Sequence, residues 1–318
     1  MKELNSRQKA FAWPYPRHRH FQAELRKAAA AWFAERHFPT LRKLPYILAH
    51  RDKWPANIIV SEVADYIRQI QLERSAQGKG FPLHKYIHHG LSSQALLFNL
   101  IGPLIVEDDS SILQPLTNSP GKKWLAENAA AQFEYEDRVV FHEDYGQPTS
   151  IDLVLTDEAG QPRIFIESKF TETEFGGCSV FAAGDCDGRT PAHDFSLCYL
   201  HHNGRRYWEL LDKYEFLAGP VGDEKVCILT HHYQFFRCLL FALEHNGMFV
   251  LLSDERSPVF NCDGPQGQRG LWPFLLSFVP EAWQASVLNM SIQDVVTAVK
   301  QSGRHPWITE FEKKYGLT

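Results

Sequence analysis

Two apolar runs that read as a pair of β-strands place the strongest constraint on this chain of 318 residues. The runs are "IDLVL" at 151–155 and "RIFIESK" at 163–169, and "TDEAGQP" between them has the residues of a longer hairpin loop. Charges interrupt both: Asp152 in the first run, and Glu167 with Lys169 at the end of the second. Side chains alternate along a strand, so Glu167 and Lys169 share a face, and hairpin pairing would bring Asp152 opposite the Glu167 end.

Two carboxylates and an amine at the end of apolar strands favour a metal site. An isolated buried carboxylate is costly and two neighbouring carboxylates repel each other, and a divalent cation relieves both problems. Mg²⁺ (or Mn²⁺) would take Asp152 and Glu167 as ligands, together with water and a phosphate. Lys169 would orient or deprotonate the attacking water, or stabilise charge on phosphorus. The pattern favours phosphodiester hydrolysis; the alternative is a salt bridge on an edge strand.

The remaining periodicities predict a mixed α/β or α+β fold. Helices are expected at 20–37, 61–76, 92–104, 232–247 and 291–303, with Ser61 and Ser92 or Ser93 as N-caps and Gly102-Pro103 as a stop signal. Further strand-like runs are 139–141, 225–230 and 248–254. The chain is expected to divide into a mainly helical region, 1–105, that packs on a core, 106–318. A Gly- and Cys-rich excursion interrupts this core at about 176–206.

Composition and charge narrow the class of protein. The chain is 44% hydrophobic and 22% charged, with no run of about 18 apolar residues that would predict a transmembrane helix. The polar, basic N-terminus lacks the apolar segment of a secretory signal, which predicts a cytoplasmic protein with reduced cysteines. The net charge is −5, but residues 1–60 hold twelve Lys and Arg against four Asp and Glu, so the remainder carries −13. A basic segment suits a polyanion such as DNA, or is a solvated helical face.

The spacing of Asp152 and Glu167-Ser168-Lys169 resembles the signature of the PD-(D/E)XK nuclease superfamily. Ile151 stands where a proline commonly precedes the aspartate, a departure that the superfamily tolerates. Other segments are similar to one bacterial branch, a family of restriction endonucleases: "SSQALLFNL", "SIDLVL", "IESKFTETEFGGC", "CDGR", "YQFFRCLLFALEHNG" and "FEKKYGL". The resemblance covers roughly residues 90 to 317. It implies a central mixed sheet flanked by helices, with Asp152 and Glu167 as metal ligands and Lys169 as the catalytic lysine.

The resemblance also suggests residues that complete the site. An acidic residue from an upstream helix or strand often does so in that fold, and Glu134 is the first candidate. Gln94 is a second, which would help to place metal or water; otherwise it is a helix-capping or core-lining amide. Gln234 would contact phosphate, or is an ordinary polar position on a helix. Glu172 and Glu174 are expected in a loop beyond the strand; if the strand continues, they join the acidic face.

The excursion offers two further candidate sites. Cys178, Cys186 and Cys198, with His201 or His202, have the ligand types of a structural zinc site, although they lack the close C-x2-C pair of common sites. Ordinary buried cysteines are the alternative. In "HHNGRRYW", Arg205 and Arg206 would contact phosphate while Tyr207 or Trp208 stacks on a base. The alternative is an exposed turn that enters an amphipathic helix.

The function that these observations favour is a bacterial, Mg²⁺-dependent DNA endonuclease in restriction or defence. Related folds usually leave a 5′-phosphate. A lone site of this type cuts one strand, so double-strand cleavage would favour a homodimer. The first alternative is a non-catalytic member of the same fold that binds nucleic acid or protein. The second is a thiol or zinc hydrolase built on the Cys/His stretch.

Overall fold

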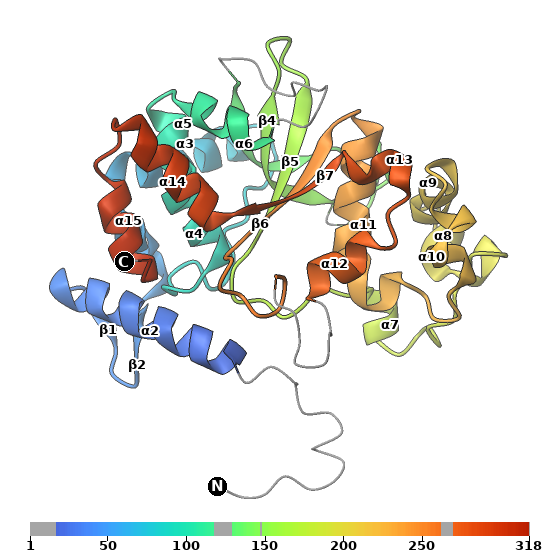
Figure 1. Ribbon diagram of the computed structural model, residues 1–318, viewed down its shortest axis with the longest axis horizontal. Helices are drawn as coiled ribbons and strands as arrows, with labels where there is room; N and C mark the ends of the chain where they lie inside the picture. Colours follow the sequence, from blue (N-terminus) through green and yellow to red (C-terminus); the bar gives the residue numbers. More distant parts are fainter. Residues whose placement is uncertain (1–16, 118–128, 147, 262–269, 318) are drawn as a thin grey trace, which may run out of the picture.

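The computed structural model describes residues 17–117, 129–146, 148–261 and 270–317, and a mixed five-stranded sheet lies at its centre (Figure 1). The strands run in the order β3-β4-β5-β6-β7. Strands β3 (Ala131–Glu136), β4 (Ser150–Thr156) and β5 (Pro162–Lys169) are antiparallel. Strands β6 (Met248–Ser253) and β7 (Val287–Ser291) continue the sheet parallel to β5. The mixed sheet flanked by helices confirms the predicted fold class.

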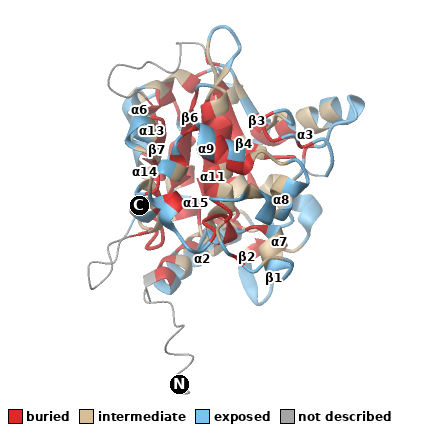
Figure 2. Ribbon diagram, turned by 90° about the vertical axis from the view of Figure 1, so that its right-hand side faces the viewer, coloured by how far each residue is buried: buried red, intermediate tan, exposed pale blue. Residues whose placement is uncertain are grey.

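Helices cover both faces of the sheet, and each face has its own hydrophobic cluster (Figures 1 and 2). The first cluster draws on α2 (Arg17–Glu35), α3 (Ser61–Ala76), α4 (Ser93–Leu100), α5 (Gly102–Val106), α14 (Ile292–Ser302) and α15 (Ile308–Tyr315). The second draws on α9 (Tyr207–Lys213), α11 (Leu229–Glu244) and α12 (Leu271–Leu276). The shorter helices are α6 (Gln114–Thr117), α7 (Ser179–Ala182), α8 (Tyr199–His202), α10 (Pro220–Asp223) and α13 (Glu281–Gln284), and the 3-10 turns are η1 (Arg51–Asn57), η2 (Ser110–Leu113), η3 (Phe195–Leu197) and η4 (Phe216–Ala218). Within the described ranges, no helix has the length and apolar character needed to cross a membrane.

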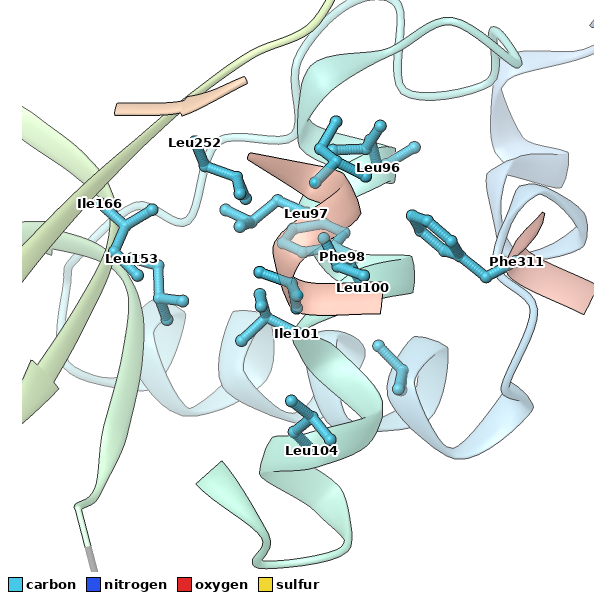
Figure 3. Close-up of a cluster of buried hydrophobic side chains, with 14 of the residues drawn as sticks. Leu96, Leu97, Phe98, Leu100, Ile101, Leu104, Leu153, Ile166, Leu252 and Phe311 are labelled. Atoms are coloured by element: carbon cyan, nitrogen blue, oxygen red, sulfur yellow. The ribbon is translucent and has the colours of Figure 1, made fainter. Parts of the chain in front are cut away.

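Alternation along β5 decides which way the charged residues point. Ile164 and Ile166 belong to the first cluster, and Phe165 between them belongs to the second. On the first face, side chains of α4 pack toward Leu153 and Ile166 (Figure 3). Burial of each such side chain is worth about 1.5–3 kcal/mol, which fixes the register of the strand. Glu167 and Lys169, which alternate with Ser168, therefore project toward α11.

The N-terminal region is more varied than the predicted helices. Helices α2 and α3 confirm two of them, but a hairpin of β1 (Thr40–Leu41) and β2 (Leu44–Leu48) separates them. The single helix expected at 92–104 was wrong, because α4 ends at Leu100 and α5 begins at Gly102. Ser92 caps α4 as predicted, by accepting a hydrogen bond from Ala95 N at 3.3 Å. Pro103 fits the first turn of α5 because no helical partner is needed there.

Two predicted strands were wrong. Residues 139–141 form a turn, in which Val140 and Phe141 are apolar because they are buried in the second cluster. Residues 225–230 contribute an isolated bridge from Val226 to Arg189, and α11 begins at Leu229. Both runs are short and apolar. Such a run indicates that a segment is buried, but it does not distinguish a strand from other conformations. The strand expected at 248–254 and the helices expected at 232–247 and 291–303 correspond to β6, α11 and α14.

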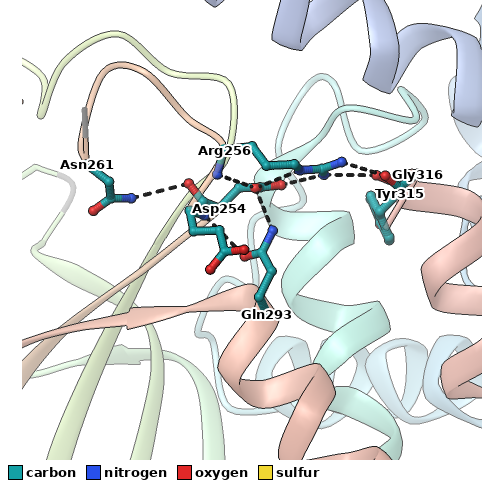
Figure 4. A network of polar contacts seen from close by, with 7 residues as sticks. Asp254, Arg256, Asn261, Gln293, Tyr315 and Gly316 are labelled. Atoms are coloured by element: carbon teal, nitrogen blue, oxygen red, sulfur yellow. Dashed lines mark hydrogen bonds and ion pairs between the residues drawn. The ribbon is translucent and has the colours of Figure 1, made fainter. Parts of the chain in front are cut away.

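A polar network joins the end of β6 to the last two helices (Figure 4). The Asp254 carboxylate is buried and accepts hydrogen bonds from Arg256 Nη2 at 2.6 Å and from Gln293 Nε2 at 2.7 Å. The same Arg256 guanidinium donates to the carbonyls of Tyr315 and Gly316 at the C-terminal end of α15. A guanidinium satisfies a carboxylate and two carbonyls at once, so this network orders the helices of the first face.

Lys314 is fully buried in α15, where it donates to the Asn57 carbonyl and lies 4.5 Å from the Trp32 ring centroid. Burial, followed by the charge of Arg36, lowers the pKa of Lys314 well below its usual range. The unfolded chain then binds a proton that the folded chain excludes. Stability is therefore lost as pH falls below the ordinary lysine pKa of about 10.4 toward the folded value, and gained as pH rises through this window.

We expect Lys314→Met to stabilise the fold by about 1–3 kcal/mol at pH 7, because it removes a buried amine without creating a large cavity. The Asn57 carbonyl keeps its bond from Asn99 Nδ2 at 3.0 Å. Denaturant unfolding between pH 7 and pH 9.5 should show a rise in the stability of the wild type that the variant lacks. Exposed Lys313, which pairs with Glu310 at 3.0 Å, provides the control as Lys313→Met and should change little. A variant less stable than wild type at pH 7 would contradict the expectation.

Candidate active site

Three acidic side chains lie at one level across neighbouring strands: Glu134 on β3, Asp152 on β4 and Glu167 on β5. The register follows from the pairs Phe133 with Leu153, Tyr135 with Ile151, and Leu153 with Ile166. Asp152 Oδ2 accepts a hydrogen bond of 2.9 Å from Ser168 N, which links β4 to β5 beyond their last register pair. The hairpin expected from the sequence therefore forms, and the acidic residue proposed upstream lies on the next strand.

Glu134 and Glu167 are buried and Asp152 is half-buried, and the three carboxylates are near enough for their charges to interact. Burial raises the pKa of Asp152 well above its usual range, and the charges of Glu167 and Glu134 raise it further. Burial also raises the pKa of Glu134 to about 6, against the lowering effect of its hydrogen bonds from Ser150 and Gln94. Carboxylates that are held together in this way suit a hard divalent cation, which would remove the repulsion.

Glu134 is held firmly in position. Its carboxylate accepts hydrogen bonds from Gln94 Nε2 at 2.7 Å and from Ser150 Oγ at 2.8 Å. Its backbone has φ +50°, in the left-handed region that costs a non-glycine residue about 1–3 kcal/mol. Gln94 Oε1 in turn accepts a hydrogen bond from His84 N at 2.8 Å. The structure thus brings the two candidates Gln94 and Glu134 together, and it gives Gln94 a positioning contact rather than the alternative role of a helix cap.

Lys169, Glu167 and Gln234 form a compact triad between β5 and α11. Lys169 Nζ lies 3.0 Å from Glu167 Oε1 and donates to Gln234 Oε1 at 2.7 Å. Gln234 Nε2 donates to Glu167 Oε1 at 2.5 Å, and Cys238 Sγ lies 3.8 Å from Glu167 Oε2. Burial alone would lower the pKa of Lys169, but Glu167 and other nearby carboxylates raise it above its usual range. The amine is therefore an ammonium group that one acid and one amide hold in place.

One cavity of about 760 Å³ joins these groups. The predicted residues that line it are Gln94, Glu134, Asp152, Glu167, Lys169 and Gln234. Among the residues that the structure describes, no three His, Cys, Asp or Glu side chains converge closely enough to enclose a metal by themselves. Mg²⁺ does not require such a cage, since it binds one or two carboxylates and keeps several waters. The oxygen donors of Asp152 and Glu167 fit that requirement.

Other predicted site residues lie elsewhere. Arg205 donates to the carbonyls of His142 and Tyr145, and Arg206 pairs with Glu209 at 3.3 Å; neither lines the cavity. Their contact with phosphate stays a prediction. Tyr207 and Trp208 are buried in the second cluster, so the proposed base stacking on these rings was wrong. Glu172 and Glu174 follow the end of β5 in a loop, as expected, and Glu172 lines the cavity.

The cysteines of the excursion are free and near one another. Burial raises the pKa of Cys227 to about 12, and the thiols of Cys198, Cys178 and Cys186 add to the effect. Cys227, which was not among the predicted ligands, is thus near all three predicted cysteines. His201 lies beside Phe195 and 3.9 Å from Glu209. In the described part of the chain these groups do not close around a metal, and a structural zinc ion stays a prediction.

Sequence reasoning missed the segment at 82–91, between α3 and α4. His84, Tyr86 and His89 from this segment line the same cavity, with Tyr46 and Arg26 from β2 and α2. The signal was present as "HKYIHH", a cluster of histidines with a tyrosine. It lies on a turn-rich segment without periodicity, so no pattern assigned it to the site.

The fold and the cavity together define a mixed α/β protein with two features on its sheet. One is a row of acidic residues, Glu134, Asp152 and Glu167, called the acidic row below, and the other is the buried Lys169. The chain belongs to the family described as "Restriction Endonuclease associating with ARP", whose model matches residues 26–316. This confirms the resemblance to restriction endonucleases, and the family description suggests a nuclease or defence-related role with DNA as substrate. Comparisons with curated proteins and with solved structures found no match.

Proposed function

We propose that this protein is a metal-dependent DNA endonuclease of the PD-(D/E)XK type that acts in restriction or defence. The observation that carries the proposal is the placement of Asp152 and Glu167 at one level on paired strands, with Lys169 on the face of Glu167. The family membership of the chain agrees with nuclease chemistry. The spacing in sequence suggested this arrangement, and the register of the hairpin brings the same three residues to one cavity.

Asp152 and Glu167 would hold Mg²⁺ or Mn²⁺, with Glu134 as an additional acidic partner. The metal, when bound, would lower the pKa of water and neutralise charge on the scissile phosphate. Glu134 is positioned by Gln94 and Ser150, so its carboxylate can accept a proton or a hydrogen bond from the attacking water at a fixed place.

Lys169 would stabilise the negative charge that develops on phosphorus. Its ammonium group projects into the cavity from the same strand as Glu167. Gln234 bridges Lys169 and Glu167 and holds the two side chains in place. Such a preorganised donor costs no reorganisation when the charge appears, which is the source of most electrostatic catalysis.

Metal-dependent cleavage tests the proposal directly. Supercoiled plasmid and unmethylated phage DNA would be incubated with the protein in Mg²⁺, in Mn²⁺ and in EDTA. We expect nicked or linear products with either metal and none in EDTA. Glu167→Gln, purified in parallel, keeps the size of the side chain but weakens the metal site and should give no products. Equal cleavage by both proteins would reveal a contaminant. Binding without cleavage on every DNA, modified DNA included, would instead support a non-catalytic member of the family.

A further inference from the structure

The cavity has an aromatic wall, which we define as His84, Tyr86 and His89. The Tyr86 ring centroid lies 5.2 Å from that of His84 and 4.8 Å from that of His89. Tyr86 nevertheless keeps 45% of its surface exposed. A ring with this much exposed surface can present part of a face to a planar ligand.

Cations accompany these rings. Lys85 Nζ lies 4.7 Å from the Tyr86 ring centroid, and the Arg26 guanidinium lies 5.3 Å from the ring of Tyr46, a further residue of the cavity. Aromatic faces that alternate with Lys and Arg are the combination by which proteins bind single-stranded nucleic acid, since rings stack on bases and cations follow the phosphates. The carboxylates and Lys169 line the same cavity, so a base on the wall would lie on the strand that is cut.

The aromatic wall is rigid because its backbone is anchored. Side chains from two neighbouring elements, η1 and α4, donate hydrogen bonds to backbone carbonyls of the segment at 82–91. These are Gln94 to Pro82 at 3.1 Å, Arg51 to Leu83 at 2.8 Å, and Asn57 to Ile87 at 2.7 Å and to His89 at 2.8 Å. Gln94 also bonds Glu134, so the wall and the acidic row are positioned by one side chain. A preorganised stacking surface loses little entropy on binding.

Tyr86 and the acidic residues Glu134, Asp152 and Glu167 line one cavity, so a group that stacks on the ring would lie beside the scissile phosphate. A nucleobase offers a face for such stacking only when it is out of the base stack of a duplex. We propose that Tyr86 stacks on an unpaired nucleobase next to the scissile phosphate, so that the substrate is DNA with an unpaired nucleotide. This inference rests on the proposed function and specifies its substrate. Either a single strand or a nucleotide turned out of a duplex presents the required base.

Binding assays without cleavage test the role of Tyr86. The affinity for a labelled single-stranded oligonucleotide, for the matched duplex and for a duplex with one unpaired nucleotide would be measured by fluorescence anisotropy in EDTA. We expect wild type to bind both DNAs with unpaired bases more tightly than the matched duplex. Tyr86→Ala should weaken that binding roughly 5- to 100-fold, the effect of losing one stacked base. Tyr86→Phe should keep it, because the ring supplies the contact.

Tyr199→Ala provides the matched control. Tyr199 is 58% exposed on α8 and does not line the cavity, so its removal should leave all three affinities unchanged. Circular dichroism would confirm that each variant is folded. Equal affinities of Tyr86→Ala and wild type for the single strand would overturn the inference, as would wild-type affinity for the matched duplex equal to that for the single strand.

The outcome separates this inference from the proposed function. Cleavage of matched duplex that is unaffected by Tyr86→Ala would support the nuclease and reject the unpaired base. Tight binding of unpaired DNA that depends on Tyr86, without cleavage in Mg²⁺ or Mn²⁺, would support the stacking site and reject the nuclease. A cleaving protein with a Tyr86-dependent preference for unpaired DNA would support both, and absence of both binding and cleavage of any DNA would reject both.

Discussion

Replacement of Lys169 by Met should lower the rate of DNA cleavage by about 10²- to 10⁴-fold while metal binding persists. The ammonium group lies 3.0 Å from Glu167 and is held by Gln234, so its charge is fixed where the phosphate would enter. Met has a similar length and no charge, so the cavity keeps its shape. The loss should therefore appear in the maximal rate and much less in the affinity for DNA, because the interaction strengthens in the transition state.

Single-turnover cleavage with excess enzyme measures the effect, together with calorimetric titration of Mn²⁺ into both proteins. Lys300→Met is the matched control, because Lys300 pairs with Glu312 at 2.8 Å on the surface of α14. We expect that variant to cleave like wild type. Undiminished cleavage by Lys169→Met would assign the chemistry to other residues, and loss of Mn²⁺ binding would mean that the lysine supports the metal site instead of the reaction.

Replacement of Asp152 by Asn should abolish metal binding and cleavage and, in EDTA, stabilise the fold by about 1–3 kcal/mol. The wild-type carboxylate is half-buried and level with Glu134 and Glu167, whose charges oppose its ionisation; Lys169 and the Ser168 N–H offset only part of this cost. The amide oxygen of Asn can still accept the hydrogen bond from Ser168 N. The fold thus carries a cost at this position that a bound metal would offset further.

Thermal unfolding with and without Mg²⁺ tests both halves of this expectation. The unfolding temperature of wild type should rise with Mg²⁺. Asp152→Asn should unfold at a higher temperature than wild type without metal, and Mg²⁺ should not raise that temperature further. Asp157→Asn provides a control of opposite sign, because Asp157 pairs with Arg163 at 2.9 Å on a partly exposed turn. That variant should be slightly less stable and should respond to Mg²⁺ like wild type. A lower stability of Asp152→Asn in EDTA would show that the carboxylate helps to hold the strands together.

The sequence predicted the part of the fold on which the chemistry depends. The two runs at 151–155 and 163–169 became β4 and β5, because alternating burial and a turn between them left one register. The same alternation predicted that Glu167 and Lys169 share a face, which their ion pair confirms. The predictions failed where the local pattern is ambiguous. Phe141 is apolar because a turn buries it against the second cluster, and β7 combines apolar residues with Asn289, so its sequence does not stand out as a strand.

The candidate site was predictable in part. Glu134 and Gln94 came from resemblance to nucleases, and only the three-dimensional structure shows that one hydrogen bond joins them. Gln234 was expected to contact phosphate, but it lies between Lys169 and Glu167. The aromatic wall was missed because contacts between 82–91 and β2 or α4 depend on tertiary packing, which no periodicity reports. The roles of all these residues stay predictions until the variants are measured.

The anchoring of the segment at 82–91 has a consequence for how the protein can diversify. Its hydrogen bonds from Gln94, Arg51 and Asn57 end on backbone carbonyls, which any amino acid provides. The shape of the segment is therefore largely independent of the side chains at 84–86, whereas the acidic row lies on separate strands. Substitutions at those three positions can alter what the cavity admits without disturbing the chemistry beside it, so directed evolution of substrate preference should begin with His84, Lys85 and Tyr86.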